Sequence, residues 1–177
     1  MILREETAAD HDAAREVQRA AFGGAKGDVV ARLLDALRRD DPKWTGVVAE
    51  DGGEVIGHVL FTTSLLDAPS RLVDVRVLSP IAVAPDRQRQ GVGKRLIEYG
   101  VALMEERGVP LVFLEGDPAY YSRRGFSPGG DHGFRKPSLR LPDVAFQVVK
   151  LSAYEEWMTG TLVYLHTFWD LDCVGLR

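Results

Sequence analysis

The spacing of apolar residues near the start of the chain predicts one strand and two helices. Residues 2–6 alternate apolar and charged side chains, as a short strand does. Apolar residues then recur every three or four positions, first up to Gly23 and Gly24 and again over about residues 28–39, so we predict two amphipathic helices. Their apolar faces comprise Ala14, Val17 and Ala21 in the first helix and Val30, Leu33, Leu34 and Leu37 in the second.

The pattern then changes from helical to extended. Two runs rich in β-branched residues, 46–50 and 54–63, flank Asp51-Gly52-Gly53, an arrangement typical of a β-hairpin. Residues 72–83 predict another long strand. We expect this strand to bend near Ser79-Pro80, because proline cannot donate to a ladder and is found at bulges.

A helix, a buried strand and a shorter helix are predicted next. The first helix begins at Val92 and ends near Gly108, and the very apolar run at residues 111–115 has the composition of a buried strand. The shorter helix is expected to begin near Pro118, because proline suits a first turn, and to end at Gly125. The apolar face of the longer helix consists of Val92, Leu96, Ile97, Tyr99, Val101, Leu103 and Met104.

The last third of the chain is less regular. Residues 129–142 contain glycines and prolines and predict the longest loop, whereas residues 143–151 predict a strand. The aromatic-rich residues 157–169 are interpreted as a last strand. Strands and helices therefore alternate around one expected central sheet, which predicts an α+β (mixed α/β) fold in a single domain, residues 1–177.

Composition narrows the functional classes. The chain has 177 residues, 45% hydrophobic and 27% charged, which is ordinary for a folded domain. Its net charge of −4 argues against a sequence-independent nucleic-acid binder. Cys173 is the only cysteine, so neither an intrachain disulfide nor a cysteine-based zinc cluster is expected. No run approaches the roughly 18 apolar residues of a membrane span, and the N-terminus lacks a signal-peptide pattern, so we expect a cytoplasmic protein.

The segment from residue 79 to 94 is the most informative in the chain. A strand-like run ends at Pro85, a polar turn follows, and Gly91 and Gly93 precede an amphipathic helix. Unpaired backbone N–H groups and the dipole at a helix N-terminus attract anions, and glycine lets a phosphate approach the backbone. Arginines and a lysine surround the turn: Arg87, Arg89, Lys94 and Arg95. The same features also fit an ordinary strand-to-helix connection with solvated arginines.

Two motifs in this order resemble the GNAT superfamily of acyl-coenzyme A-dependent N-acetyltransferases. Gln88-x-x-Gly91-x-Gly93 is similar to the first motif of that family, and Tyr120-Tyr121-x-x-x-Gly125-Phe126 is similar to its downstream motif. The run Gly116-Asp117-Pro118-Ala119-Tyr120-Tyr121 also resembles a bacterial subgroup. The resemblance implies a mostly antiparallel, twisted sheet flanked by helices, with the strand at residues 72–83 splayed by a bulge near Ser79-Pro80.

The resemblance also implies how acetyl-coenzyme A would bind, with no metal. The loop from Gln88 to Lys94 would wrap the pyrophosphate through main-chain N–H groups. The preceding strand would pair with the pantetheine arm as an added strand would. The implied binding residues are Ile81, Ala82, Val83, Gln88, Arg89, Gln90, Gly91, Val92, Gly93 and Lys94.

Acetyl transfer to an amine requires a base for the ammonium proton and an acid for the departing thiolate, since these groups have pKa values near 10 and 8.5. By resemblance Tyr121 is the acid, although its ring could simply pack, whereas Tyr120 is expected in the core. Glu115, at the end of a buried strand, is our candidate base, although it could be a solvated strand end. Asp117 is interpreted as a helix cap. Weaker candidate bases, expected at the surface or in loops, are Asp74, His58 and His132; His166 is expected to pack in a strand.

These observations leave two functional hypotheses. The first is an enzyme that moves an acetyl group from acetyl-coenzyme A directly to a primary amine of a small molecule or peptide. The second is a non-catalytic acyl-coenzyme A-binding sensor or interaction module. Neither hypothesis involves nucleic acid or a membrane, and a homodimer formed through the aromatic tail stays open. The acceptor amine is not identified by any segment of the sequence.

Overall fold

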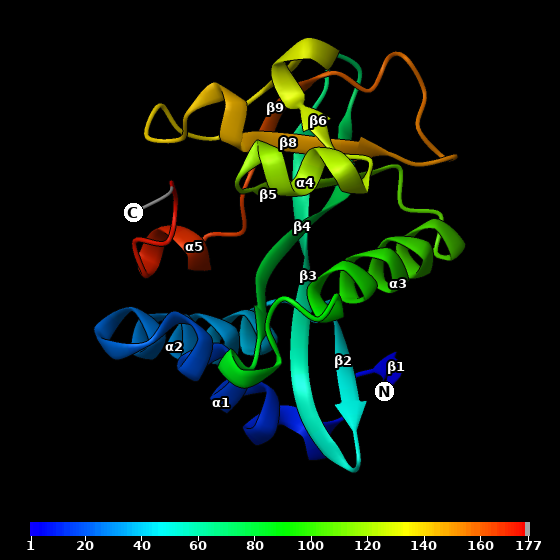
Figure 1. Cartoon of the computed structure of the whole chain (residues 1–177). Coiled ribbons are helices and arrows are strands. Elements are labelled where there is room, and N and C mark those ends of the chain that lie inside the picture. The colour runs from blue at the N-terminus through cyan, green and yellow to red at the C-terminus, as the bar shows by residue number, and fades with distance from the viewer. Residues whose placement is uncertain (176–177) are drawn as a thin grey trace. The chain divides into compact units, whose positions relative to one another are not determined.

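The computed structural model describes residues 1–175, which form two compact units. The first unit contains residues 1–62 and 79–101, and the second contains residues 63–78 and those from 102 onward. Strands β3 (Glu54–Asp67) and β4 (Leu72–Val83) and helix α3 (Val92–Glu106) each run from one unit into the other (Figure 1). The expectation of a single domain stays a prediction. No helix within residues 1–175 has the length and apolar character needed to cross a membrane.

The strands of the first unit form an antiparallel sheet. β1 (Ile2–Glu5) pairs with β2 (Thr45–Asp51), and β2 pairs with β3 through the predicted hairpin. Gly52 and Gly53 have φ angles of 60° and 85°, in the left-handed region that glycine adopts without strain, so the turn residues match the turn. The sequence therefore predicted both this hairpin and the first strand correctly.

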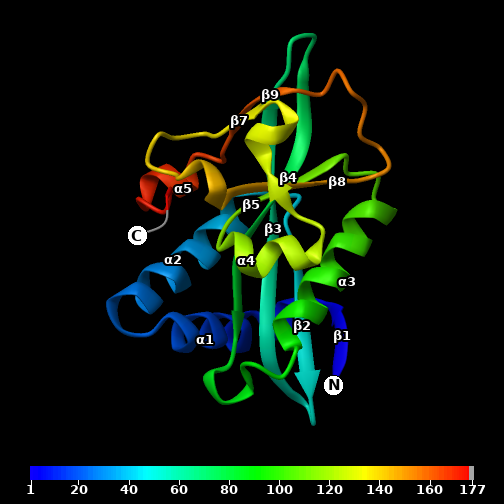
Figure 2. The same ribbon diagram turned by 45° about the horizontal axis from the view of Figure 1, so that its top comes forward.

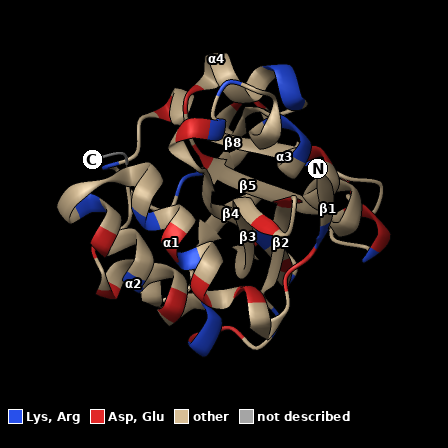
Figure 3. Cartoon of the chain, turned by 60° about the horizontal axis from the view of Figure 1, so that its bottom comes forward, with Lys and Arg blue, Asp and Glu red and all other residues tan. Residues whose placement is uncertain are grey.

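Helices α1 (His11–Phe22) and α2 (Gly24–Asp40) also belong to the first unit. The second helix begins at Gly24, earlier than predicted, because the break between the helices needs only Gly23 and Gly24, whose φ angles are 66° and 48°. A Cβ on Gly27 would lie 2.2 Å from the carbonyl oxygen of Arg19, so the missing side chain lets the two helices approach closely. The outer faces carry interspersed acidic and basic residues (Figure 3). The predicted apolar positions are buried except Ala21, which is half-buried.

The second unit contains the short strands and helices of the C-terminal half. β5 (Leu111–Glu115) pairs in parallel with β4 and antiparallel with β8 (Phe146–Lys150), and β8 pairs with β6 (Ser127–Pro128). Figure 2 shows α4 (Pro118–Tyr121) beside β5. Phe113 on β5 stacks on Phe146 at 5.5 Å between ring centroids, so aromatic rings form much of this core.

The irregular part of the chain contains more structure than we predicted. The expected loop at residues 129–142 includes a short strand, β7 (Phe134–Arg135). β7 pairs in parallel with β9 (Gly160–Val163), which also pairs antiparallel with the end of β3. The aromatic tail is thus a strand followed by a short helix, α5 (Thr167–Asp170). A two-residue strand such as β7 is too short to show an alternating pattern. It forms only through pairing with β9, which is distant in the sequence.

Two tyrosines that were expected in the core lie at the surface instead. Tyr99 is 37% exposed and Tyr120 is 38% exposed. On α3 the core-facing position beside Tyr99 is Gly100, where a Cβ would meet the ring of Phe61 at 2.3 Å. The helix thus buries a large aromatic ring against a glycine rather than burying its own tyrosine. The predicted fold class is confirmed: a mixed α/β fold with a mostly antiparallel sheet flanked by helices.

Candidate active site

The loop at residues 88–94, in the first unit, connects β4 and the short turn Pro85–Arg87 to α3. Arg89 and Gly91 have φ angles of 61° and 84°, so the backbone reverses just before the helix. The N–H of Arg95 donates to the carbonyl of Gly91 at 3.1 Å, which closes the first turn of α3. The N–H groups of residues 92–94 therefore have no acceptor within the helix, as an anion-binding N-terminus requires.

Side chains of the loop hold its two ends together. The amide Nε2 of Gln88 donates to the carbonyl of Val83 at 3.1 Å, and that of Gln90 donates to the carbonyl of Asp86 at 3.1 Å. Arg87 forms an ion pair with Asp51 at 3.1 Å. Arg87 thus stabilises the turn rather than standing as a free cation.

The start of α3 packs on β3 through a glycine that we did not single out. Val92 and Leu96 are buried, and a Cβ on Gly57 would meet them at 3.0 and 2.9 Å. The close approach of α3 to Gly57 fixes where the helix begins. A glycine inside a predicted strand is a signal of such a close approach, and it could have indicated this contact. On β4 the predicted coenzyme-binding residues alternate, with Ala82 buried and Ile81 and Val83 half-buried.

Tyr121, in the second unit, is the last residue of α4. Asp117 caps this helix, since its Oδ1 accepts from the N–H of Ala119 at 2.9 Å, as predicted. The Tyr121 side chain is 9% exposed, and burial raises the pKa of its phenol to about 12. Among residues 1–175 its hydroxyl has no hydrogen-bond partner. At neutral pH this phenol is therefore a protonated donor that the rest of the described chain does not use.

Glu115 is held by two donors of the C-terminal segment, also within the second unit. The hydroxyl of Tyr164 donates to Oε1 at 2.7 Å, and the N–H of Gly175 donates to Oε2 at 2.9 Å. Burial raises the pKa of the carboxyl, while these two hydrogen bonds act in the opposite direction. Tyr164 was missed because its only sequence signal is membership of the aromatic tail.

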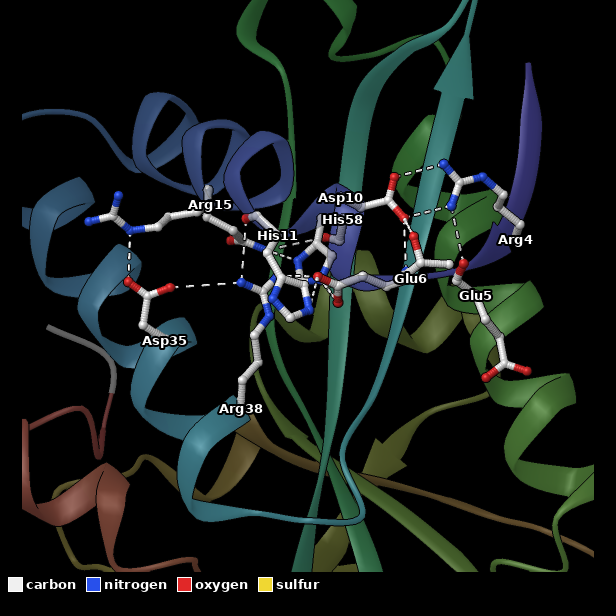
Figure 4. A network of polar contacts seen from close by, with 11 residues as sticks. Arg4, Glu5, Glu6, Asp10, His11, Arg15, Asp35, Arg38 and His58 are labelled. Carbon is white, nitrogen blue, oxygen red and sulfur yellow. Dashed lines mark hydrogen bonds and ion pairs between the residues drawn. The ribbon is translucent and has the colours of Figure 1, made fainter.

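A buried polar cluster in the first unit, which we call the Glu6 cluster, contains Glu6, Gln18, Arg38 and His58. Figure 4 shows Glu6, Arg38 and His58 pointing toward one another. The prediction of His58 at the surface is wrong, because its side chain is fully buried on β3. Gln18 Nε2 can only donate, so Nδ1 of His58, 2.9 Å away, accepts, and Nε2–H donates to Glu6 Oε2 at 3.0 Å. Burial lowers the pKa of His58.

The Glu6 carboxylate also pairs with the guanidinium of Arg38, whose pKa burial lowers. A Cβ on Gly46 would lie 1.8 Å from Glu6 Oε2, so this glycine leaves room for the carboxylate. The cluster joins the segment directly after β1 to β3 and to both helices. Its titratable groups bind one another, which makes it a structural feature of the first unit.

The other candidate bases occupy different environments. His132 Nε2 lies 2.6 Å from Ser127 Oγ within the second unit. Asp74 is exposed on β4. His166 was predicted to pack in a strand, but this is wrong: its side chain is 85% exposed and pairs with Asp170 at 3.1 Å. The reason is that the chain leaves β9 at Val163 and starts α5.

The chain is similar in sequence to known acetyltransferases. A family model described as an acetyltransferase (GNAT) domain matches residues 3–129. YjhQ of Escherichia coli strain K12, described as an uncharacterized N-acetyltransferase, is 36% identical over 151 residues, or 82% of each chain. YhbS of the same strain, described in the same words, is 34% identical over 155 residues, which are 86% of this chain and 88% of YhbS.

Solved structures give the same result. The crystal structure of the GNAT family N-acetyltransferase YhbS from Escherichia coli in complex with CoA has a TM-score of 0.84 at 31% identity, covering 94% of this chain and 91% of that one. A GNAT family acetyltransferase from Brucella melitensis in complex with acetyl-CoA has a TM-score of 0.75 at 28% identity, covering 94% and 97%. From the family match, the relatives and the shared fold, the chain belongs to the GNAT family of N-acetyltransferases.

Proposed function

We propose that this chain transfers the acetyl group of acetyl-coenzyme A directly to a primary amine of a small molecule or peptide. The family membership and the CoA and acetyl-CoA complexes of the two similar structures support the co-substrate. The observation that carries the catalytic role is the Tyr121 phenol, which is buried, protonated and without a hydrogen-bond partner among residues 1–175.

The loop at residues 88–94 fits a pyrophosphate group. A Cβ on Gly91 would meet nothing within 4 Å, so the space beside this backbone is open to a ligand. The first-turn N–H groups of α3 would donate to phosphate oxygens, and the loop arginine Arg89 and Lys94 supply positive charge. Residues Ile81, Ala82 and Val83 of β4 would offer backbone groups to the pantetheine arm.

In the transfer the amine nitrogen attacks the thioester carbonyl carbon. The new C–N bond forms, the C–S bond breaks, and the sulfur leaves with the bonding electron pair. The amine must lose a proton and the thiolate must gain one. We assign the donor at sulfur to Tyr121 and the acceptor of the amine proton to Glu115, directly or through a water.

Glu115 suits a base because burial raises its pKa, which makes the carboxylate a better proton acceptor near neutral pH. Each of its oxygens accepts one hydrogen bond from the protein, so each retains a lone pair. The two donors also fix the direction of the carboxylate. These contacts support the assignment of Glu115 ahead of His58, which is fully buried and bound on both ring nitrogens.

Thiol release from acetyl-coenzyme A, measured across a panel of amines, tests this function. Tyr121→Phe should lower kcat on the order of 10²-fold, because a positioned general acid contributes that much. Tyr154→Phe is the matched control, since Tyr154 contacts Phe134 and Lys150 rather than Tyr121 and should keep wild-type turnover. Binding of acetyl-coenzyme A without turnover of any amine would instead support the non-catalytic module.

A further inference from the structure

Gly116 lies between the two proposed catalytic residues and directly against the Tyr121 ring. A Cβ at this position would lie 2.2, 2.7 and 3.2 Å from Cε2, Cδ2 and Cζ of Tyr121. The φ angle of Gly116 is not in the left-handed region, so the backbone itself does not require glycine. The reason for glycine here is steric: the edge of the phenol occupies the volume that a side chain would fill.

The backbone of Gly116 is fixed on both sides by β8 and the turn before it. Its N–H donates to the carbonyl of Ala145 at 3.0 Å, and its carbonyl accepts from Nε2 of Gln147 at 3.0 Å. Gln147 is fully buried, which is unusual for an amide side chain unless the amide holds a specific partner. Gln147 thereby fixes the position of the Gly116 backbone, against which the Tyr121 ring packs.

The other sides of the ring are also occupied. Tyr120 and Phe126 approach Tyr121 edge-on, with ring centroids 4.9 and 5.9 Å away. The backbone N–H of Tyr121 donates to the carbonyl of Asp117 at 3.1 Å. We call Gly116, Tyr120, Phe126 and Gln147 the Tyr121 seat. Because Tyr120 and Phe126 occupy two further sides of the ring, a side chain on Gly116 would displace the ring from its present orientation.

We propose that Gly116 and Gln147 are positioning residues that aim the Tyr121 hydroxyl at the reacting sulfur. The inference rests on the function proposed for Tyr121. A donor stabilises developing charge only at hydrogen-bond distance and in line, so a displacement of about 1 Å can cost on the order of 10²-fold in rate. Gly116 and Gln147 both act through the orientation of the phenol.

Gly116→Ala tests the steric part. We expect kcat to fall about 10-fold or more while KM for acetyl-coenzyme A stays within about 2-fold, because ring orientation affects the transition state and not binding. Gly130→Ala is the matched control: a Cβ there would meet nothing within 4 Å, and its φ is likewise outside the left-handed region. Gln147→Met, which keeps the shape and loses the donor, should lower kcat in the same way but less.

A double-mutant cycle separates positioning from a general structural defect. In the Tyr121→Phe background there is no hydroxyl left to aim, so adding Gly116→Ala or Gln147→Met should change kcat by less than about 2-fold. Labelling with 3-fluorotyrosine adds a readout independent of turnover. The ¹⁹F resonance that disappears in Tyr121→Phe should shift in Gly116→Ala and not in Gly130→Ala.

The outcomes distinguish the positioning role of Gly116 and Gln147 from the proposed acid role of Tyr121. If Tyr121→Phe is slow but Gly116→Ala turns over at the wild-type rate, or if the losses simply multiply, the positioning role is overturned and the function of Tyr121 stands. If Tyr121→Phe itself keeps wild-type kcat, both are overturned. Should Gly116→Ala fail to fold, Gln147→Met replaces it in the double-mutant cycle and in the ¹⁹F comparison.

Discussion

The Glu6 cluster and the Tyr121 seat each bury titratable side chains, but they differ in whether those side chains have polar partners within the protein. In the first unit, Glu6, His58 and Arg38 each have a partner inside the cluster. In the second unit, the Tyr121 ring is held on several sides while its hydroxyl has no partner within residues 1–175.

In the Glu6 cluster the charged groups pair with one another, which offsets the cost of burying them, although Gln18 Oε1 and Arg38 Nε have no partner among the described residues. The Tyr121 hydroxyl makes no hydrogen bond within residues 1–175, and its oxygen is not fully buried, so water or a ligand can reach it. The comparison thus separates polar groups that the fold pairs from a hydroxyl that is free to meet the proposed substrate. Glu115 lies between these cases, because the protein orients its carboxylate while burial raises its pKa.

The largest effect on stability is expected from breaking the Glu6 cluster. Arg38→Met should lower the free energy of unfolding by about 3 kcal/mol, because it leaves the Glu6 carboxylate buried without its cation. Urea denaturation measures the change. Arg39→Met is the matched control, since Arg39 is the neighbouring residue and largely exposed, and its midpoint should not move. Equal losses in both variants would contradict a structural role for the cluster.

The converse is expected of Tyr121. Tyr121→Phe should reduce kcat on the order of 10²-fold and leave the urea midpoint where it is, because the hydroxyl has no partner in the described structure to lose. Measuring both quantities on one preparation tests the contrast directly. A clear loss of stability in Tyr121→Phe would show that the fold uses this hydroxyl after all.

His58 should make the stability of the first unit depend on pH. Burial holds its folded-state pKa below the unfolded value, so its contribution is present above about pH 6.5 and is lost as pH falls towards the folded pKa. The slope from one such group is at most about 1.4 kcal/mol per pH unit. Urea titrations between pH 5 and 8 should show this slope in the wild type, and His58→Gln should flatten it.

A smaller effect is expected at Glu115. Tyr164→Phe removes a hydrogen bond that lowers the pKa of this carboxyl, so that pKa should rise further. If Glu115 is the base, the acid limb of kcat/KM against pH moves to higher pH. Tyr154→Phe, which makes no contact with Glu115 among those described, leaves the limb in place. An unmoved limb in Tyr164→Phe would remove Glu115 from the mechanism.

Local chemistry made several elements predictable. Asp51-Gly52-Gly53 specified a hairpin because glycine adopts left-handed φ angles without strain, and Asp117-Pro118 specified a capped helix start. Periodicity placed the buried faces of both N-terminal helices. The two spaced motifs around Gly91 and Tyr121 indicated the family, because they occur in the family's order and in the expected strand and helix setting.

Predictions failed where long-range contacts decide a residue's surroundings. His58 and His166 are each a histidine in an extended, partly apolar run, yet one is fully buried and the other is exposed. Gly116 and Gln147 carry no local signal of their connection, because 31 positions separate them in the chain. Likewise Tyr164 and Glu115 are 49 positions apart in the chain. They meet because β9, directly before Tyr164, pairs with β3 in the same sheet that contains β5 and Glu115.

The sequence by itself determined the fold class, the N-terminal strands and helices and the family, since these follow from periodicity, turn chemistry and short motifs. Only the tertiary structure decided which polar groups pair with one another. Pairing depends on distances between segments far apart in the chain. A sequence fixes those distances only through the packing of the whole core, and no single stretch of residues displays them.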